Sequence, residues 1–127
     1  MQIKIRLESE AKLYIQEQVL NKSLQLVWSY MLDFENEHNP FEERAGVIGK
    51  WKGKAVICIE ENETILSTAR ILFQKGLKSK DAIHIACAIY AGCDYFITTD
   101  EKILKKLKSS NDIKVMNPLE YIRQKDN

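Results

Sequence analysis

The stretch that most constrains the fold runs from Ser79 to Asp100 and reads SKDAIHIACAIYAGCDYFITTD. Ser79 is a good N-cap, which places Asp81 in the first helical turn, where a carboxylate suits the helix dipole. The residues that follow, up to position 91, are apolar on nearly every side and predict a buried helix. Residues 95–98 lack polar alternation, as in a parallel strand covered on both faces. The chain must therefore bury a helix and a strand in direct succession.

The rest of the chain alternates helical and strand-like patterns. Short apolar runs predict strands at 24–29, 55–59 and 113–116. Apolar residues at helical spacing, with suitable start and stop residues, predict helices at 3–21, 30–37, 41–51, 61–75, 101–108 and 118–122. The first five residues also alternate like a strand, so the start of the first helix is ambiguous. This order predicts an α/β fold with a mainly parallel sheet in one domain over residues 1–127.

Charge and composition narrow the function classes. The net charge is +1, so no strong overall field attracts nucleic acid or membrane, and a nucleic-acid role must rest on local patches. The N-terminus shows no apolar signal-peptide core, and no apolar run reaches membrane-spanning length. The three cysteines, Cys58, Cys87 and Cys93, are an odd number and resemble small hydrophobic residues in a reducing compartment. We therefore expect a cytoplasmic protein with no membrane association.

Three carboxylates stand at suggestive places. Glu35 follows the 24–29 strand, Asp81 begins the buried helix, and Asp100 ends the 95–98 strand. All three are expected toward the C-terminal edge of a parallel sheet, where open α/β folds bind ligands. Two carboxylates at ~4 Å repel by about 4 kcal/mol at an effective dielectric near 20. Such a cluster therefore favours a divalent cation, and Mg²⁺ or Mn²⁺ is the choice for oxygen ligands.

Simpler interpretations stay open for each residue. Asp81 could serve only the helix dipole, Asp100 could be only an N-cap, and Glu35 could be a surface acid. His84 shares a helix face with Asp81 and could touch substrate or metal, although a hydrogen-bonded structural role is the commoner fate of such a histidine. A zinc group of His84, Cys87 and Cys93 is disfavoured because no second ligand pair appears. A nucleotide-binding α/β domain is disfavoured because no Gly-rich phosphate loop is present.

Two segments, KDAIHIACAIYAGCDYFITTDEKILKKL and IKVMNPLEYI, resemble the C-terminal half of a PIN domain. PIN domains are Mg²⁺- or Mn²⁺-dependent nucleases, and bacterial ones are often VapC-type toxins of toxin–antitoxin modules. Asp81 matches the family's third acid, and Asp100 matches the fourth. Glu35 matches the second acid, six residues after Ser29. The resemblance implies a three-layer α/β/α fold, catalytic and metal-binding roles for these three acids, an RNA substrate, a small antitoxin partner and a homodimer.

Flanking polar residues fit the same resemblance. Ser29, Thr98 and Thr99 could orient a ligand or water, and they could equally satisfy backbone groups at strand ends. A basic run near Asp100 could track a phosphate backbone or form a solvated face, and its candidate contacts are Lys102, Lys105 and Lys106.

The sequence departs from the family at its N-terminal side. PIN domains start with a strand that ends in an Asp, whereas this sequence begins where the family's first long helix would begin, and Asp33 is too late to replace that acid. We therefore expect an N-terminally truncated PIN-like fold. Either the true start lies upstream, or the protein is an inactive relative that acts as a binding module.

Overall fold

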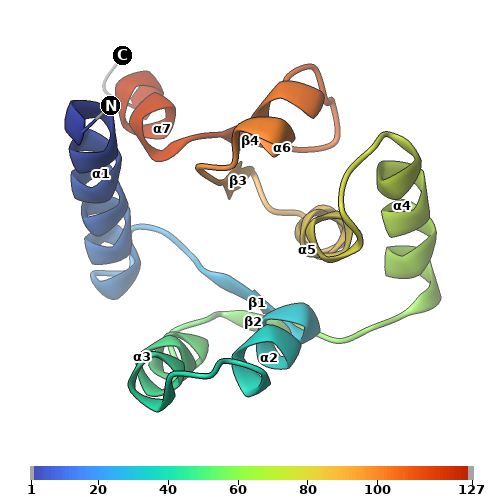
Figure 1. Ribbon diagram of the computed structural model, residues 1–127, viewed down its shortest axis with the longest axis horizontal. Helices are drawn as coiled ribbons and strands as arrows, with labels where there is room; N and C mark the ends of the chain where they lie inside the picture. The colour runs from blue at the N-terminus through green and yellow to red at the C-terminus, as the bar shows by residue number, and fades with distance from the viewer. Residues whose placement is uncertain (1, 126–127) are drawn as a thin grey trace. The chain divides into compact units, whose positions relative to one another are not determined.

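Residues 2–125, the part of the chain that the computed structural model describes, form seven helices and four short strands (Figure 1). The chain divides into two compact units, which are described separately. The middle unit comprises Gln25–Gly92, and the terminal unit comprises Met1–Leu24 with Cys93–Asn127.

The middle unit contains one pair of parallel strands and four helices. Strand β1 (Val27–Ser29) pairs in parallel with β2 (Ile57–Ile59), so that Trp28 lies opposite Cys58. The helices are α2 (Tyr30–Glu37), α3 (Glu42–Lys52), α4 (Glu63–Gln74) and α5 (Ser79–Tyr90).

The core of the middle unit lies where α4 packs against α5 (Figure 1). Ile65 and Ile85 are fully buried, and Cys87 is almost so. Burying a side chain the size of isoleucine contributes about 1.5–3 kcal/mol, so these residues anchor the helix pair. Helix α4 begins because Asn62 caps it, its Oδ1 accepting from Ile65 N at 2.9 Å. It ends before Gly76, whose φ of +100° lies in the left-handed region that favours glycine.

The terminal unit contains the second strand pair and three helices. Strand β3 (Tyr95–Ile97) pairs in parallel with β4 (Lys114–Met116). Helix α1 (Gln2–Leu20) packs against α7 (Pro118–Lys125), and α6 (Glu101–Lys106) follows β3 (Figure 1).

Aromatic packing and a reciprocal cap stabilise the C-terminal end of this unit. Tyr95 of β3 meets the buried Tyr121 of α7 edge to face, with ring centroids 5.1 Å apart. Asn117 Oδ1 accepts from Glu120 N at 2.8 Å, and Glu120 Oε1 accepts from Asn117 N at 3.3 Å. These two bonds satisfy backbone donors at the start of α7 in the manner of a capping box.

The predicted α/β character and the parallel strand pairing are confirmed, and the finer three-layer PIN-like arrangement stays a prediction. Each strand is shorter than predicted, as the 24–29 run shows by forming a strand only over Val27–Ser29. The terminal helix continues to Lys125 rather than ending at position 122. Among residues 2–125, no helix has both the length and the apolar character needed to cross a membrane.

One local prediction was wrong, and one alternative that the sequence left open is excluded. Ser79 is not the N-cap of α5, because Lys78 holds the extended conformation (φ −67°, ψ 152°) and Ser79 is already helical. The strand alternative for the first residues also fails, since the helix starts at Gln2.

Candidate functional site

Glu35 and His84 meet between α2 and α5 of the middle unit. His84 donates from Nε2 to Glu35 Oε1 at 2.7 Å. The His84 side chain is 16% exposed and the Glu35 side chain 39% exposed. Because a carboxylate only accepts, the contact fixes the proton of a neutral imidazole on Nε2 and leaves Nδ1 with the lone pair. The contact thus joins an oriented imidazole to the Oε1 atom of a carboxylate.

Ser29 sets the start of the helix that carries Glu35. It is extended (φ −129°, ψ 157°) and 5% exposed, and its Oγ accepts from Leu32 N at 3.4 Å. This bond satisfies one of the free backbone donors at the start of α2. The sequence left open whether Ser29 orients a ligand or satisfies a backbone group, and in the structure Ser29 satisfies a backbone group.

Asp81 lies one helical turn from this pair. It is half-buried in the first turn of α5, three residues before His84. Residues three apart on a helix are neighbours on one face, so α5 presents Asp81 and His84 along the same side. Within the described residues 2–125, no group of three or more His, Cys, Asp and Glu side chains could hold a metal ion. The carboxylates of Glu35 and Asp81 nonetheless suit Mg²⁺, which is commonly held by one or two carboxylates and keeps several of its waters.

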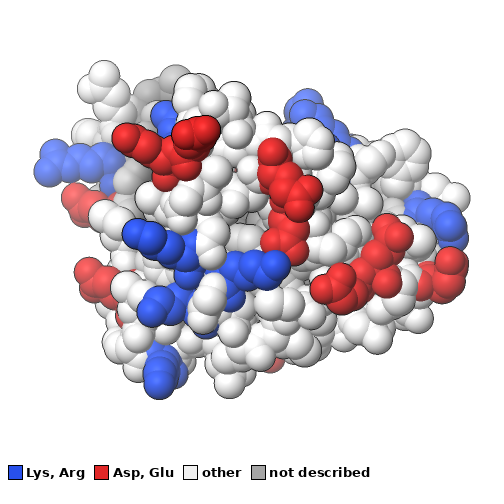
Figure 2. Space-filling model, turned by 90° about the horizontal axis from the view of Figure 1, so that it is seen from below, with Lys and Arg blue, Asp and Glu red and all other residues white. Residues whose placement is uncertain are grey.

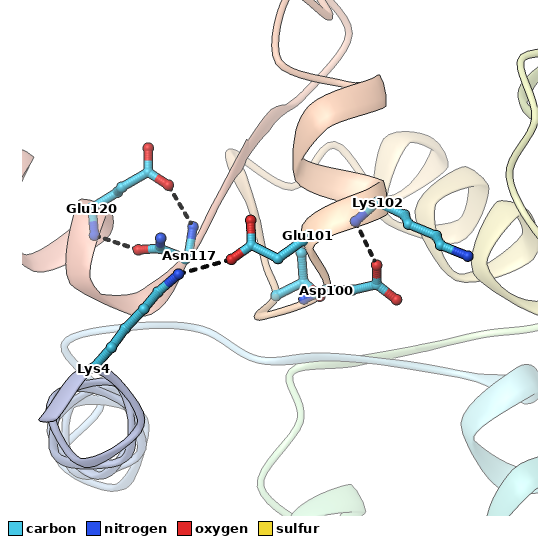
Figure 3. Close-up of polar contacts among 7 residues, drawn as sticks. Lys4, Asp100, Glu101, Lys102, Asn117 and Glu120 are labelled. Atoms are coloured by element: carbon cyan, nitrogen blue, oxygen red, sulfur yellow. Dashed lines mark hydrogen bonds and ion pairs between the residues drawn. The ribbon is translucent and has the colours of Figure 1, made fainter. Parts of the chain in front are cut away.

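Asp100 caps helix α6 of the terminal unit. Its Oδ1 accepts from Lys102 N at 2.9 Å (Figure 3) and also from Ile103 N at 3.2 Å. Thr98 supports the turn, because its Oγ1 accepts from Asp100 N at 3.1 Å and its own N donates to Met116 O at 3.0 Å. Thr99 is exposed. The predicted N-cap role of Asp100 is confirmed, and its metal-binding role stays a prediction.

The three candidate RNA-contact lysines, Lys102, Lys105 and Lys106, are all exposed on α6. The neighbouring Glu101 instead pairs with Lys4 of α1 at 2.9 Å, and this pairing raises the pKa of Lys4 (Figure 3). Both partners are well exposed, so the pair adds little stability. The face drawn in Figure 2 carries both basic and acidic side chains.

Asp33, another acid of α2, has structural partners. Trp28 donates from Nε1 to Asp33 Oδ1 at 2.9 Å, and Lys52 Nζ lies 3.0 Å from the same oxygen. The indole N–H, and then Lys52, lower the pKa of the Asp33 carboxyl. Trp28 is 4% exposed and belongs to the core. These contacts tie β1, α2 and α3 together.

The buried Cys87 lies beside Ser29, and the half-buried Tyr30 follows Ser29 in the chain. Burial raises the pKa of the Cys87 thiol to about 11, although a hydrogen bond with Ser29 acts in the opposite direction. Burial also raises the pKa of Tyr30 to about 12, with smaller contributions from Cys87 and Glu61. All three cysteines of the chain are free thiols in the described structure, and the buried Cys87 is a poor nucleophile because little thiolate forms near neutral pH.

A separate apolar hollow of about 350 Å³ lies between α4 and α5. Leu66, Ala69 and Phe73 line one side, and Ala82 and Ile83 line the other. None of the three candidate acids lines it.

Comparison of the chain with protein-family models, curated proteins and solved structures finds no match. The candidate site therefore rests on the geometry of this chain. The contact that sequence reasoning missed is the one between Glu35 and His84. The two residues are 49 positions apart, so no local pattern could indicate it. The only available signal was the shared helix face of His84 and Asp81.

Proposed function

We propose that this protein is a PIN-like, metal-dependent endoribonuclease. The observation that carries the proposal is the 2.7 Å contact between Glu35 and His84. It draws one predicted ligand to the helix that carries another, Asp81, one turn away. Two of the three predicted acids, Glu35 and Asp81, therefore lie on helices α2 and α5, which pack against each other in the middle unit.

The chain's residues then take distinct roles. Glu35 and Asp81 would bind Mg²⁺ or Mn²⁺ through carboxylate oxygens, and Asp100 would be the third ligand that the resemblance implies. The cation would supply a water of lowered pKa and stabilise negative charge at phosphorus. Thr98 and Thr99 would flank Asp100, and Lys102, Lys105 and Lys106 would contact backbone phosphates, so RNA binding would weaken as salt rises.

The partners belong to the same proposal. The resemblance to VapC-type toxins implies a small antitoxin that inhibits the nuclease, a homodimer and a cytoplasmic location.

A second candidate is a non-catalytic PIN relative that binds a partner without cleaving RNA. The observation that favours it is that two of the acids already have structural roles. Asp100 accepts two backbone N–H groups as an N-cap, and Glu35 accepts from His84.

Cleavage of a labelled RNA by the purified full chain tests the proposal. We expect cleavage in Mn²⁺ or Mg²⁺ and none in EDTA. Glu35→Gln and Asp81→Asn should each lower the rate by more than about tenfold, because even partners of metal ligands typically matter by this much. Glu37→Gln is the matched control, since Glu37 is an exposed acid on the same helix.

Calorimetric titration with Mn²⁺ gives a second measurement. Wild type should show saturable binding that Glu35→Gln and Asp81→Asn weaken. Cleavage that persists in EDTA, or that both variants retain in full, would overturn the proposal. RNA binding without cleavage at any cation concentration would support the second candidate.

A further inference from the structure

Phe34 is an exposed aromatic residue beside the candidate site. It precedes Glu35 on α2, and 45% of its surface is accessible. Its ring lies against the His38 imidazole, with centroids 4.5 Å apart and planes inclined by 38°. His38 is held in this position because its Nδ1 donates to the Phe34 carbonyl oxygen at 2.7 Å.

A cation from the neighbouring helix completes the group. Lys80 of α5 places Nζ 5.6 Å from the centroid of the Phe34 ring. Lys80 directly precedes Asp81, just as Phe34 directly precedes Glu35. In the described part of the chain, no side chain caps the start of α5. The positive end of the helix dipole therefore adds to the charge of Lys80.

These three side chains suit a nucleotide better than another ligand. The exposed part of the Phe34 ring offers an aromatic surface on which a base can stack, and stacking is tolerant of base identity. A lysine at the same place neutralises the adjoining phosphate. A duplex keeps its bases inside the helix, so only an unpaired strand can use the ring.

We propose that Phe34, His38 and Lys80 form a stacking platform that binds a nucleotide of single-stranded RNA next to the Glu35–His84 pair. The inference rests on the proposed function in naming RNA, and it adds the residues that hold one nucleotide of the strand. The base stacks on the exposed part of the Phe34 ring, His38 supports that ring, and the phosphate meets Lys80.

Fluorescence anisotropy of a short labelled single-stranded RNA tests the platform on the full chain in EDTA, where cleavage plays no part. Phe34→Leu should weaken binding by roughly 5- to 150-fold, the fold-change that corresponds to the loss of one base–aromatic stack. Phe34→Tyr keeps the ring and should bind like wild type. Lys80→Gln should reduce the slope of log affinity against log salt by about 1.

Phe41→Leu is the matched control. Phe41 is 55% exposed at the start of α3, and Arg44 lies 4.6 Å from its ring centroid. Phe41 and Arg44 thus form a second aromatic–cation pair, which is not adjacent to Glu35 in the sequence. Loss of the Phe41 ring should leave RNA affinity unchanged. Circular dichroism melts of each variant report whether the fold is retained.

Different results would overturn the platform proposal and the nuclease proposal. Three results would overturn the platform. Phe34→Leu could bind RNA as tightly as wild type does, or it could lose no more RNA affinity than Phe41→Leu does. The wild-type chain could also bind a duplex RNA as tightly as the single strand. None of these results bears on cation-dependent cleavage. Conversely, binding that depends on Phe34 in a chain that never cleaves RNA would support the platform and overturn the nuclease.

Discussion

His84 donates to the Glu35 carboxylate at 2.7 Å and so joins α5 to α2 across 49 residues of sequence. Both side chains are partly shielded from water. The contact therefore has a structural role that can be measured independently of any reaction.

A double-mutant cycle on this pair should give a coupling free energy of about 0.5–1.5 kcal/mol, the usual net contribution of such a hydrogen bond. The variants are Glu35→Ala, His84→Ala and the double variant, compared by urea unfolding near neutral pH. Glu37→Ala combined with His84→Ala is the control and should be additive. Additivity of the Glu35 and His84 variants would mean that the contact contributes nothing to stability.

Substitution of Asp100 separates its capping role from a role in metal binding. Asp100→Ala removes the acceptor for two backbone N–H groups and should destabilise the protein by about 1 kcal/mol. Asp100→Asn keeps an equally good cap, so its unfolding free energy should stay within a few tenths of a kcal/mol of wild type. If Asp100 also binds the cation, Asp100→Asn should still lose Mn²⁺ affinity. A stability loss in Asp100→Asn as large as that in Asp100→Ala would contradict the capping role.

The depressed pKa of Asp33 predicts a pH-dependent contribution to stability. The Trp28 indole N–H, and then Lys52, hold the folded-state pKa below the ordinary value of 3.8. The resulting stabilisation is present above that ordinary value and is lost as pH falls through the lower folded-state pKa.

Asp33→Asn keeps an acceptor for Trp28 and removes only the charge. Its urea midpoint should fall below that of wild type by a constant amount at about pH 5 to 7, and the gap should close as the pH drops below about 3.8. Asp112→Asn, in an exposed loop, controls for the change in net charge. If the difference in urea midpoint between wild type and Asp33→Asn widened in acid, the Asp33 pKa would not be lowered by folding.

Two glycine substitutions should shift stability in opposite directions. Within the described structure, a Cβ added at Gly46 or at Gly92 meets no atom within 4 Å, so space does not distinguish them. Gly46 lies inside α3, and Gly46→Ala should stabilise by about 0.8–1 kcal/mol because alanine is the better helix former. Gly92 has φ +75°, and Gly92→Ala should destabilise by about 1–2 kcal/mol. Thermal unfolding measures the stability change in both variants. If both variants shifted the unfolding temperature in the same direction, backbone φ would not explain how the two glycines differ.

Local patterns were enough to predict most elements of this chain. Helix α2 occupies the predicted residues Tyr30–Glu37, and α5 contributes Ala82 and residues 85–88 to the core. Asp100 was predictable as an N-cap because the chemistry of a cap involves only neighbouring residues. Ser79 was mispredicted for the same reason that helix ends are difficult in general: a shift of one residue changes the capping position and costs little free energy.

The sequence by itself determined the succession that runs from the buried helix α5 through strand β3 to Asp100. Its apolar residues, its glycine with positive φ and its capping aspartate act over a few positions. Only the tertiary structure decided that Glu35 binds His84 and that Asp33 binds both Trp28 and Lys52. These partners come from elements that meet only when their apolar faces pack, and no local periodicity encodes which polar side chains that packing brings within hydrogen-bonding distance.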